Sequence, residues 1–222
     1  LVSGKSTFVP AQIVSAAHKS IEPQIRHVTS IGLATWPTRD GARLAGINEL
    51  LERESYMIMW LNQLTLPRLA LTSLLSRHTS LARHIEACER FRLKIHVIPL
   101  LTDTPTHAVA VIAEDMSGHA PRFAIGLKAH RSLPLAIEKA MTEALRARRR
   151  YRLWEAEGNV WNVTPVPQIG HHERLYYWGV PEHAQQLEFL IRGPEVEVAH
   201  KEWEHDSEKE HLERLVSWCR EK

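Results

Sequence analysis

The chain is short of the features that mark several protein classes. Its 222 residues include two cysteines, Cys88 and Cys219, which are too few for a disulfide framework and suit a reducing cytosol. No apolar run approaches the roughly 18 residues of a membrane-spanning helix, and no signal peptide is visible at the start. We therefore predict a cytoplasmic protein without a membrane partner.

Charge and catalytic motifs are also sparse. The net charge is only +2, which predicts no nucleic-acid partner, and we interpret the five arginines in 146–152 as a solvated helix end. The segment Gly4-Lys5-Ser6 resembles the end of a phosphate-binding loop, but the loop's first glycine is missing and Pro10 interrupts the helix that should follow. The absence of HExxH, cysteine–histidine ladders and a Ser–His–Asp set argues against zinc enzymes and hydrolases of these types.

Hydrophobic periodicity predicts a regular succession of helices and strands. It indicates an α/β, or mixed α+β, fold with a mixed β-sheet flanked by helices, in which the helices starting at Asp40 and Pro134 lie side by side. Residues 64–79 fit neither pattern clearly. The predicted helices are 10–20, 40–62, 80–93, 134–155, 181–192 and 206–222, and the predicted strands are 26–36, 94–101, 108–113 and 122–128.

The helix predicted over 40–62 carries the most distinctive group of side chains. Asp40 is a suitable N-cap, and Glu49 and Glu52 are three residues apart, so they share one helix face. One interpretation is a solvated acidic surface. The other is a magnesium site with Arg53 beside it for phosphate, because Mg²⁺ prefers oxygen ligands and arginine pairs with phosphate.

Two blocks of sequence resemble one known family. The first consists of 29–34 (TSIGLA), 39–42 (RDGA) and 48–54 (NELLERE), followed by Trp60. The second consists of 123–126 (FAIG) and 136–148 (AIEKAMTEALRAR). In this order they resemble the YcaO superfamily, over about residues 8–192.

The resemblance implies an ATP-dependent enzyme, a YcaO-type cyclodehydratase or a thioamide-forming enzyme. Such an enzyme phosphorylates a backbone amide of a ribosomally made peptide and gives an azoline or a thioamide. The implied cofactors are ATP and Mg²⁺, and the implied partners are the peptide, a protein that delivers substrate or sulfur, and a second copy in a homodimer. No catalytic residue is assigned, because the nucleophile is a Cys, Ser or Thr of the substrate, or sulfide. The implied metal ligands are Glu49, Glu52 and Glu143, and the implied ATP-binding residues are Ser30, Arg53, Arg146 and Arg148.

Departures from the family pattern keep two alternatives open. Ile31 replaces an asparagine, Trp36-Pro37 replaces a glycine–asparagine pair, and Arg146 replaces a glutamine. Ile31 and Pro37 favour a non-catalytic YcaO-like scaffold or peptide-docking subunit, whereas the intact residues Glu49, Glu52, Arg53 and Glu143 oppose it. The other alternative is an unrelated soluble α/β protein whose acidic helix is only a surface. On the family reading, 1–222 is a single YcaO-like domain that lacks upstream and C-terminal parts of the family domain.

Overall fold

The structure is a computed structural model that describes residues 6, 8–15, 23, 25, 29–159, 174–197 and 201–222. The chain divides into two compact units. Residues Leu1–Leu50 and Asp206–Lys222 form the first, and Leu51–His205 form the second. The loop-like Gly4-Lys5 pair, the end of the helix predicted over 10–20 and the start of the strand predicted over 26–36 lie outside the described residues.

The first unit contains α1 (Ala11–Val14), the first part of α2 (Arg39–Leu61) and α8 (Glu208–Glu221). The N-cap prediction for α2 is wrong by two residues. The Thr38 hydroxyl accepts the Gly41 amide at 3.1 Å, whereas Asp40 lies inside the first turn and pairs with Arg43 at 3.2 Å. A threonine oxygen two residues earlier reaches the free amides, so the helix starts there.

The strand predicted over 26–36 is wrong for the described residues 29–36, which form a turn and a loop. The Leu33 amide donates to the Ser30 carbonyl at 2.9 Å, and Gly32 has a φ of +83°. That left-handed backbone conformation breaks an extended strand, and glycine adopts it without a Cβ clash. The β-branched residues around Gly32 therefore belong to a loop rather than to a sheet.

The second unit is built on a three-stranded antiparallel sheet in the order β2-β3-β4. Its strands are β2 (Leu93–Pro99), β3 (His107–Asp115) and β4 (Phe123–His130), close to the three strands predicted for this region. A short parallel pair joins β1 (Arg68–Leu69) to β5 (Glu195–Val196). All residues of β3 after His107 are buried, as expected for an apolar central strand covered on both faces.

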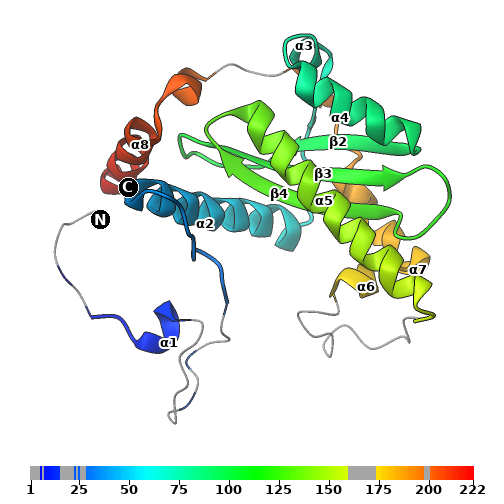
Figure 1. Cartoon of the computed structure of the whole chain (residues 1–222), viewed down its shortest axis with the longest axis horizontal. Helices are drawn as coiled ribbons and strands as arrows, with labels where there is room; N and C mark the ends of the chain where they lie inside the picture. The colour runs from blue at the N-terminus through cyan, green and yellow to red at the C-terminus, as the bar shows by residue number, and fades with distance from the viewer. Residues whose placement is uncertain are drawn as a thin grey trace. The chain divides into compact units, whose positions relative to one another are not determined.

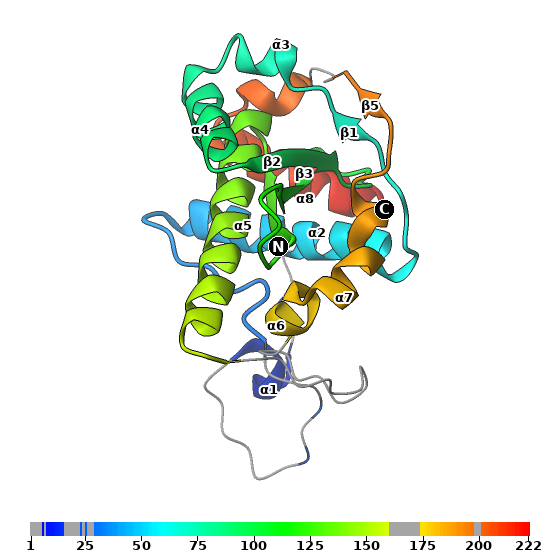
Figure 2. The ribbon, with the colours of Figure 1, turned by 90° about the vertical axis from the view of Figure 1, so that its right-hand side faces the viewer.

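Helices cover both faces of this sheet. The helix α5 (Leu133–Ala156) lies across β3 and β4, and α4 (Thr79–Arg90) packs beside β2 on the same face, after the short α3 (Thr72–Leu75) (Figures 1 and 2). The opposite face is covered by the second part of α2 and by the C-terminal helices of this unit. These are α6 (Arg174–Gly179), α7 (Pro181–Ala184) and the 3₁₀ helix η2 (Gln185–Leu190). The helix predicted over 181–192 is therefore α7 followed by η2. The 3₁₀ helix η3 (Glu202–His205) lies beside the start of β3, where Glu204 Oε1 is 2.6 Å from His107 Nε2.

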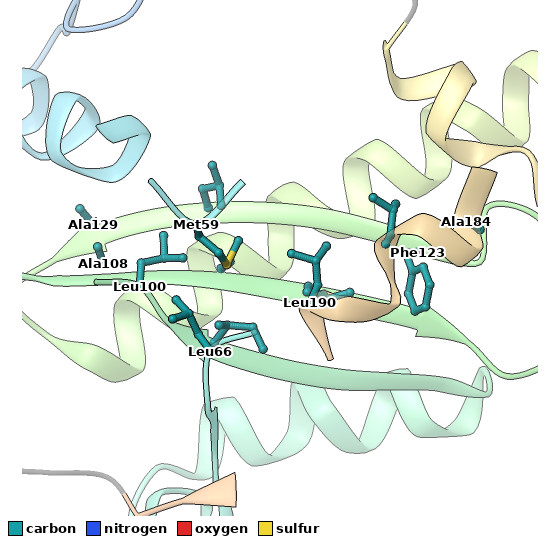
Figure 3. Packing of buried hydrophobic residues seen from close by; sticks show 13 residues of the cluster. Met59, Leu66, Leu100, Ala108, Phe123, Ala129, Ala184 and Leu190 are labelled. Carbon is teal, nitrogen blue, oxygen red and sulfur yellow. The ribbon is translucent and has the colours of Figure 1, made fainter. Parts of the chain in front are cut away.

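The core consists of two main apolar clusters, one on each face of the sheet. On the α5 face, Ile137 and Met141 pack against Val109 and Val111 of β3. On the other face, Met59 of α2 lies beside Leu66 and Leu190 (Figure 3). Together these layers confirm the predicted mixed α+β fold with a sheet flanked by helices. Within the described residues, no helix is both long enough and apolar enough to cross a membrane.

Candidate metal and nucleotide site

Close packing of α5 on β4 determines the position of Glu143. Gly126 lies under α5, where an added Cβ would be 2.0 Å from the Ala140 carbonyl oxygen and 2.5 Å from the Ala144 nitrogen. Ala140 and Ala144 are fully buried. Small residues on both elements therefore allow the helix backbone to approach the strand, and Glu143 reaches the strand edge.

Two glutamates bind the outer edge of β4. The Leu127 amide donates to Glu143 Oε2 at 2.8 Å, and the Ala129 amide donates to Glu52 Oε2 at 3.1 Å. The N–H groups of alternate residues of an edge strand point away from the sheet. Glu143 comes from α5 and Glu52 from α2, so two helices supply carboxylates to adjacent outward-facing amides.

Arg53 lies between the two glutamates. One terminal nitrogen, Nη2, is 3.5 Å from Glu52 Oε1 and 3.5 Å from Glu143 Oε1. The two Oε1 atoms are therefore separated by no more than twice that distance. The Nε of Arg53 is buried and has no hydrogen-bond partner among the described residues. One guanidinium is thus shared by both carboxylates, and its own hydrogen bonding is incomplete.

Glu52 is the most buried member of this group. Its exposed fraction is 2%, and this burial raises the pKa of its carboxyl, an effect that nearby Lys128 and Arg53 only partly oppose. Lys128 Nζ is 3.4 Å from Glu52 Oε2. The sequence reasoning missed Lys128. Its position two residues after Gly126 in a predicted strand was the available signal, and the structure shows that this strand lies at the sheet edge.

The first unit holds residues 29–34, 39–42 and 48–50 of the first resembling block. The Gly32 amide donates to Glu49 Oε2 at 3.0 Å, and the Gly32 carbonyl lies so close to Gly46 of α2 that a Cβ there would be 2.7 Å from it. Ser30 is exposed in the same loop. This unit therefore attaches the 29–32 loop to α2 through a carboxylate–amide hydrogen bond and a close backbone contact.

The two arginines of α5 have different surroundings. Arg148 Nη2 lies 2.6 Å from Asp115 Oδ2, and the Asp115 side chain is fully buried. Burial alone would raise the pKa of Asp115, but hydrogen bonds from Arg148 and Ser117 outweigh it and lower the pKa. Arg146 is exposed and lines a shallow pocket with Trp154. Of the predicted residues in the second unit, the structure thus brings together Glu52, Arg53 and Glu143, whereas Arg148 pairs with Asp115.

The chemistry of this group suits a hard cation. Both carboxylates present oxygen ligands, and a positive charge already lies between them. Within the described part of the chain, no three His, Cys, Asp or Glu side chains are close enough together to hold a metal ion. Mg²⁺ is commonly held by one or two carboxylates with water and phosphate oxygens, so a pair is an adequate protein contribution.

Fold and site together define an α+β protein with two carboxylates at a sheet edge, one buried and one partly exposed, and an arginine between them. The family model described as YcaO cyclodehydratase, ATP- and Mg²⁺-binding, matches residues 1–222. The chain therefore belongs to the YcaO family.

Solved structures share this fold. A heterocyclase in complex with substrate and cofactor has a TM-score of 0.67 at 20% identity, over 91% of this chain and 25% of that one. The YcaO protein from Methanopyrus kandleri bound with AMPPCP and Mg²⁺ has a TM-score of 0.64 at 18% identity, over 87% of this chain and 48% of that one. The E. coli microcin synthetase McbBCD complex with pro-MccB17 bound has a TM-score of 0.59 at 13% identity, over 88% of this chain and 48% of the matched one.

The chain spans a quarter to about half of the length of these matched chains. A comparison with curated proteins gave no match. The identities lie below 25%, so the likeness to these structures shows the shared fold.

Proposed function

We propose that this chain supplies the Mg²⁺–ATP site of a peptide-modifying enzyme that activates a backbone amide by phosphorylation. The product is an azoline or a thioamide in a ribosomally made peptide. The observation that carries the proposal is the placement of Arg53 between the carboxylates of Glu52 and Glu143. Family membership and the ATP- and Mg²⁺-binding description of the family model support it.

The carboxylate pair would hold the metal. Glu52 and Glu143 are its candidate ligands, because both present a carboxylate oxygen within 3.5 Å of the same Arg53 nitrogen and Mg²⁺ prefers oxygen ligands. Like charge would then move the guanidinium away from the metal. Arg53 would become available to a phosphate oxygen, and its unsatisfied Nε would gain an acceptor.

The chain's own residues would bind and orient the reactants. When bound, Mg²⁺–ATP supplies the γ-phosphoryl group that converts the amide oxygen into a leaving phosphate. Arg53 and Lys128 would neutralise phosphate charge, which is the main task of a protein in phosphoryl transfer. The nucleophile would come from the substrate or from sulfide, so no side chain of this chain is assigned to it.

The other predicted site residues enter the proposal on the family resemblance alone. Glu49 would be a further metal ligand, and Ser30, Arg146 and Arg148 would contact the nucleotide. Arg148 would have to leave Asp115 to do so. We also propose one functional domain over 1–222, a cytoplasmic location, a partner protein for substrate or sulfur delivery, and a homodimer. Sedimentation as a monomer at micromolar concentration would contradict the homodimer.

One observation favours a second function, a non-catalytic YcaO-like scaffold. One carboxylate oxygen of Glu52 and one of Glu143 each accept a hydrogen bond from a backbone amide of β4. In a scaffold, these glutamates would act only to satisfy the sheet edge, and Arg53 would be their permanent counter-ion.

Calorimetric titration of ATP separates the two functions. The chain, Glu52→Gln and Glu54→Gln are each titrated with Mg²⁺ present and with Mg²⁺ removed by chelation. Glu54 is exposed on the same helix and serves as the matched control. We expect binding only with Mg²⁺, unchanged affinity in Glu54→Gln, and at least tenfold weaker binding in Glu52→Gln, about 1.4 kcal/mol. No binding by the parent chain, or equal binding by all three, would contradict the enzyme proposal.

A further inference from the structure

The outer edge of β4 continues past the two glutamates. The Asp115 amide donates to the Arg122 carbonyl at 2.8 Å, so even-numbered residues of β4 bond toward β3. Odd-numbered residues therefore direct their N–H and C=O groups away from the sheet. The amides of Leu127 and Ala129 end on carboxylates, and the next outward pair along the strand belongs to Ile125. Within the described part of the chain, no strand pairs with this edge.

An aromatic pocket borders this same part of the edge. It has a volume of about 460 Å³, within the range of small-ligand sites, and one wall is formed by residues 123–125 of β4. Tyr56 and Trp60 of α2 and Trp178 of α6 form the facing wall. The ring centroids of Trp60 and Trp178 are 5.3 Å apart in an edge-to-face arrangement, so these rings support one another.

We propose that β4 accepts the substrate peptide as an added strand, with a large apolar side chain of the peptide in this pocket. The inference rests on the proposed function for the identity of the peptide as substrate. An extended peptide residue opposite Ile125 would exchange two main-chain hydrogen bonds with it, as in other cases of strand addition. Its side chain would lie on the same face as that of Ile125, which lines the pocket.

The spacing along the strand connects the pocket to the carboxylates. Two residues of a strand span about 6.6–6.8 Å, so the step from Ile125 to Leu127 moves a bound peptide by that length. The amide two residues from the pocketed side chain would then lie beside the Leu127–Glu143 contact. The enzyme would therefore select a position two residues away from a large apolar residue.

Peptide main-chain chemistry favours this occupant over a nucleotide base. The edge offers an outward N–H and C=O of one residue, which match both groups of a peptide residue. The pocket is lined mostly by apolar and aromatic side chains, and among the described residues in its lining Arg174 is the one cation. Binding of the adenine ring in this pocket instead is an outcome that the experiment distinguishes.

The added strand runs antiparallel to β4, since only then can one residue exchange both hydrogen bonds with Ile125, so the residue beside Leu127 is two positions before the pocketed one. The test uses a fluorescein-labelled eight-residue peptide with one Phe two residues after its only Cys, measured by anisotropy with Mg²⁺ and AMPPCP present. A second peptide is N-methylated at Phe, which removes the amide donor, and a third has Gly in place of Phe. The protein variant is Met57→Lys, because Met57 lines the pocket but is 41% exposed on α2. Calorimetric binding of Mg²⁺–AMPPCP is measured on the same variant.

We expect each change to weaken peptide binding at least tenfold, while nucleotide affinity in Met57→Lys stays within twofold of the parent. Equal affinity of the parent and N-methylated peptides would overturn strand addition, as would no peptide binding at 1 mM. Loss of nucleotide binding in Met57→Lys would assign the pocket to the nucleotide and overturn the proposal. Failure of the parent chain to bind Mg²⁺–AMPPCP would instead contradict the proposed function, while peptide binding without nucleotide still reports on the edge.

Discussion

Replacing Glu52 by glutamine tests whether its buried charge opposes folding. Glutamine keeps the size of the side chain and an oxygen that can accept the Ala129 amide. It removes the negative charge that faces Lys128 and Arg53 at 3.4 and 3.5 Å. Those two partners remain partly exposed, so water can solvate them, and Arg53 keeps its contact with Glu143.

Ion pairing and desolvation of the Glu52 carboxylate contribute to the free energy of unfolding with opposite signs and different sizes. Ion pairs with partly exposed partners are worth about 0–1 kcal/mol each, whereas removing a carboxylate from water costs several kcal/mol. The pKa of Glu52 is raised because burial outweighs the attraction of Lys128 and Arg53. The charged form is therefore less favourable in the folded state than in the unfolded chain. We expect Glu52→Gln to raise the free energy of unfolding at pH 7 by on the order of 1 kcal/mol.

The pH dependence of the unfolding free energy tests independently whether the charge on Glu52 destabilises the folded state. A group with a raised pKa binds its proton more tightly in the folded state, so its contribution to stability is full below the unfolded pKa of 4.5 and is lost as the pH rises through the folded pKa. Urea unfolding of parent and variant from pH 4 to pH 8 should show a difference that grows across this window. A variant less stable than the parent at pH 7, or a difference independent of pH, would refute the reasoning.

Three further substitutions test the supporting structure. Gly126→Ala should destabilise the chain by about 3 kcal/mol or more in urea unfolding, because the new Cβ meets the Ala140 carbonyl at 2.0 Å, and unchanged stability would contradict the close packing. Arg148→Ala should cost about 3 kcal/mol by leaving buried Asp115 unpaired, whereas a loss below 1 kcal/mol would show that the pair is dispensable. Ser207→Ala removes the hydroxyl that caps α8 and should cost about 1 kcal/mol, and no change in helix stability would refute the capping role.

Local patterns predicted most of the second unit. The apolar run in β3, the strand containing Gly126 and the helical periodicity of α5 each produce elements near the predicted bounds. These predictions are confirmed, because the hydrophobic period of each segment matches the face that the segment buries in the core. The N-terminal region was less predictable, since the positive φ of Gly32 and the Thr38 cap depend on single hydrogen bonds.

The candidate site was only partly predictable from sequence. Helical spacing places Glu52 and Arg53 on α2, but nothing local shows that Arg53 reaches Glu143 of α5. The carboxylate–amide bonds at Leu127 and Ala129 also depend on tertiary packing, and so does the approach of Lys128 to Glu52. The family resemblance supplied the grouping of Glu52 with Glu143, which no periodicity in the sequence contains.

A double-mutant cycle on Mg²⁺–AMPPCP binding tests the central claim most directly. The parent chain, Glu52→Gln, Glu143→Gln and the double variant are titrated by calorimetry, with Glu54→Gln as the exposed control. If both carboxylates hold one ion, each single glutamine replacement should weaken Mg²⁺–AMPPCP binding at least tenfold. The free-energy effects of the two replacements should be non-additive by 0.5 kcal/mol or more, in the range of about 0.5–3 kcal/mol seen for coupled residues. Affinities of all variants within twofold of the parent would contradict a metal site at Glu52 and Glu143.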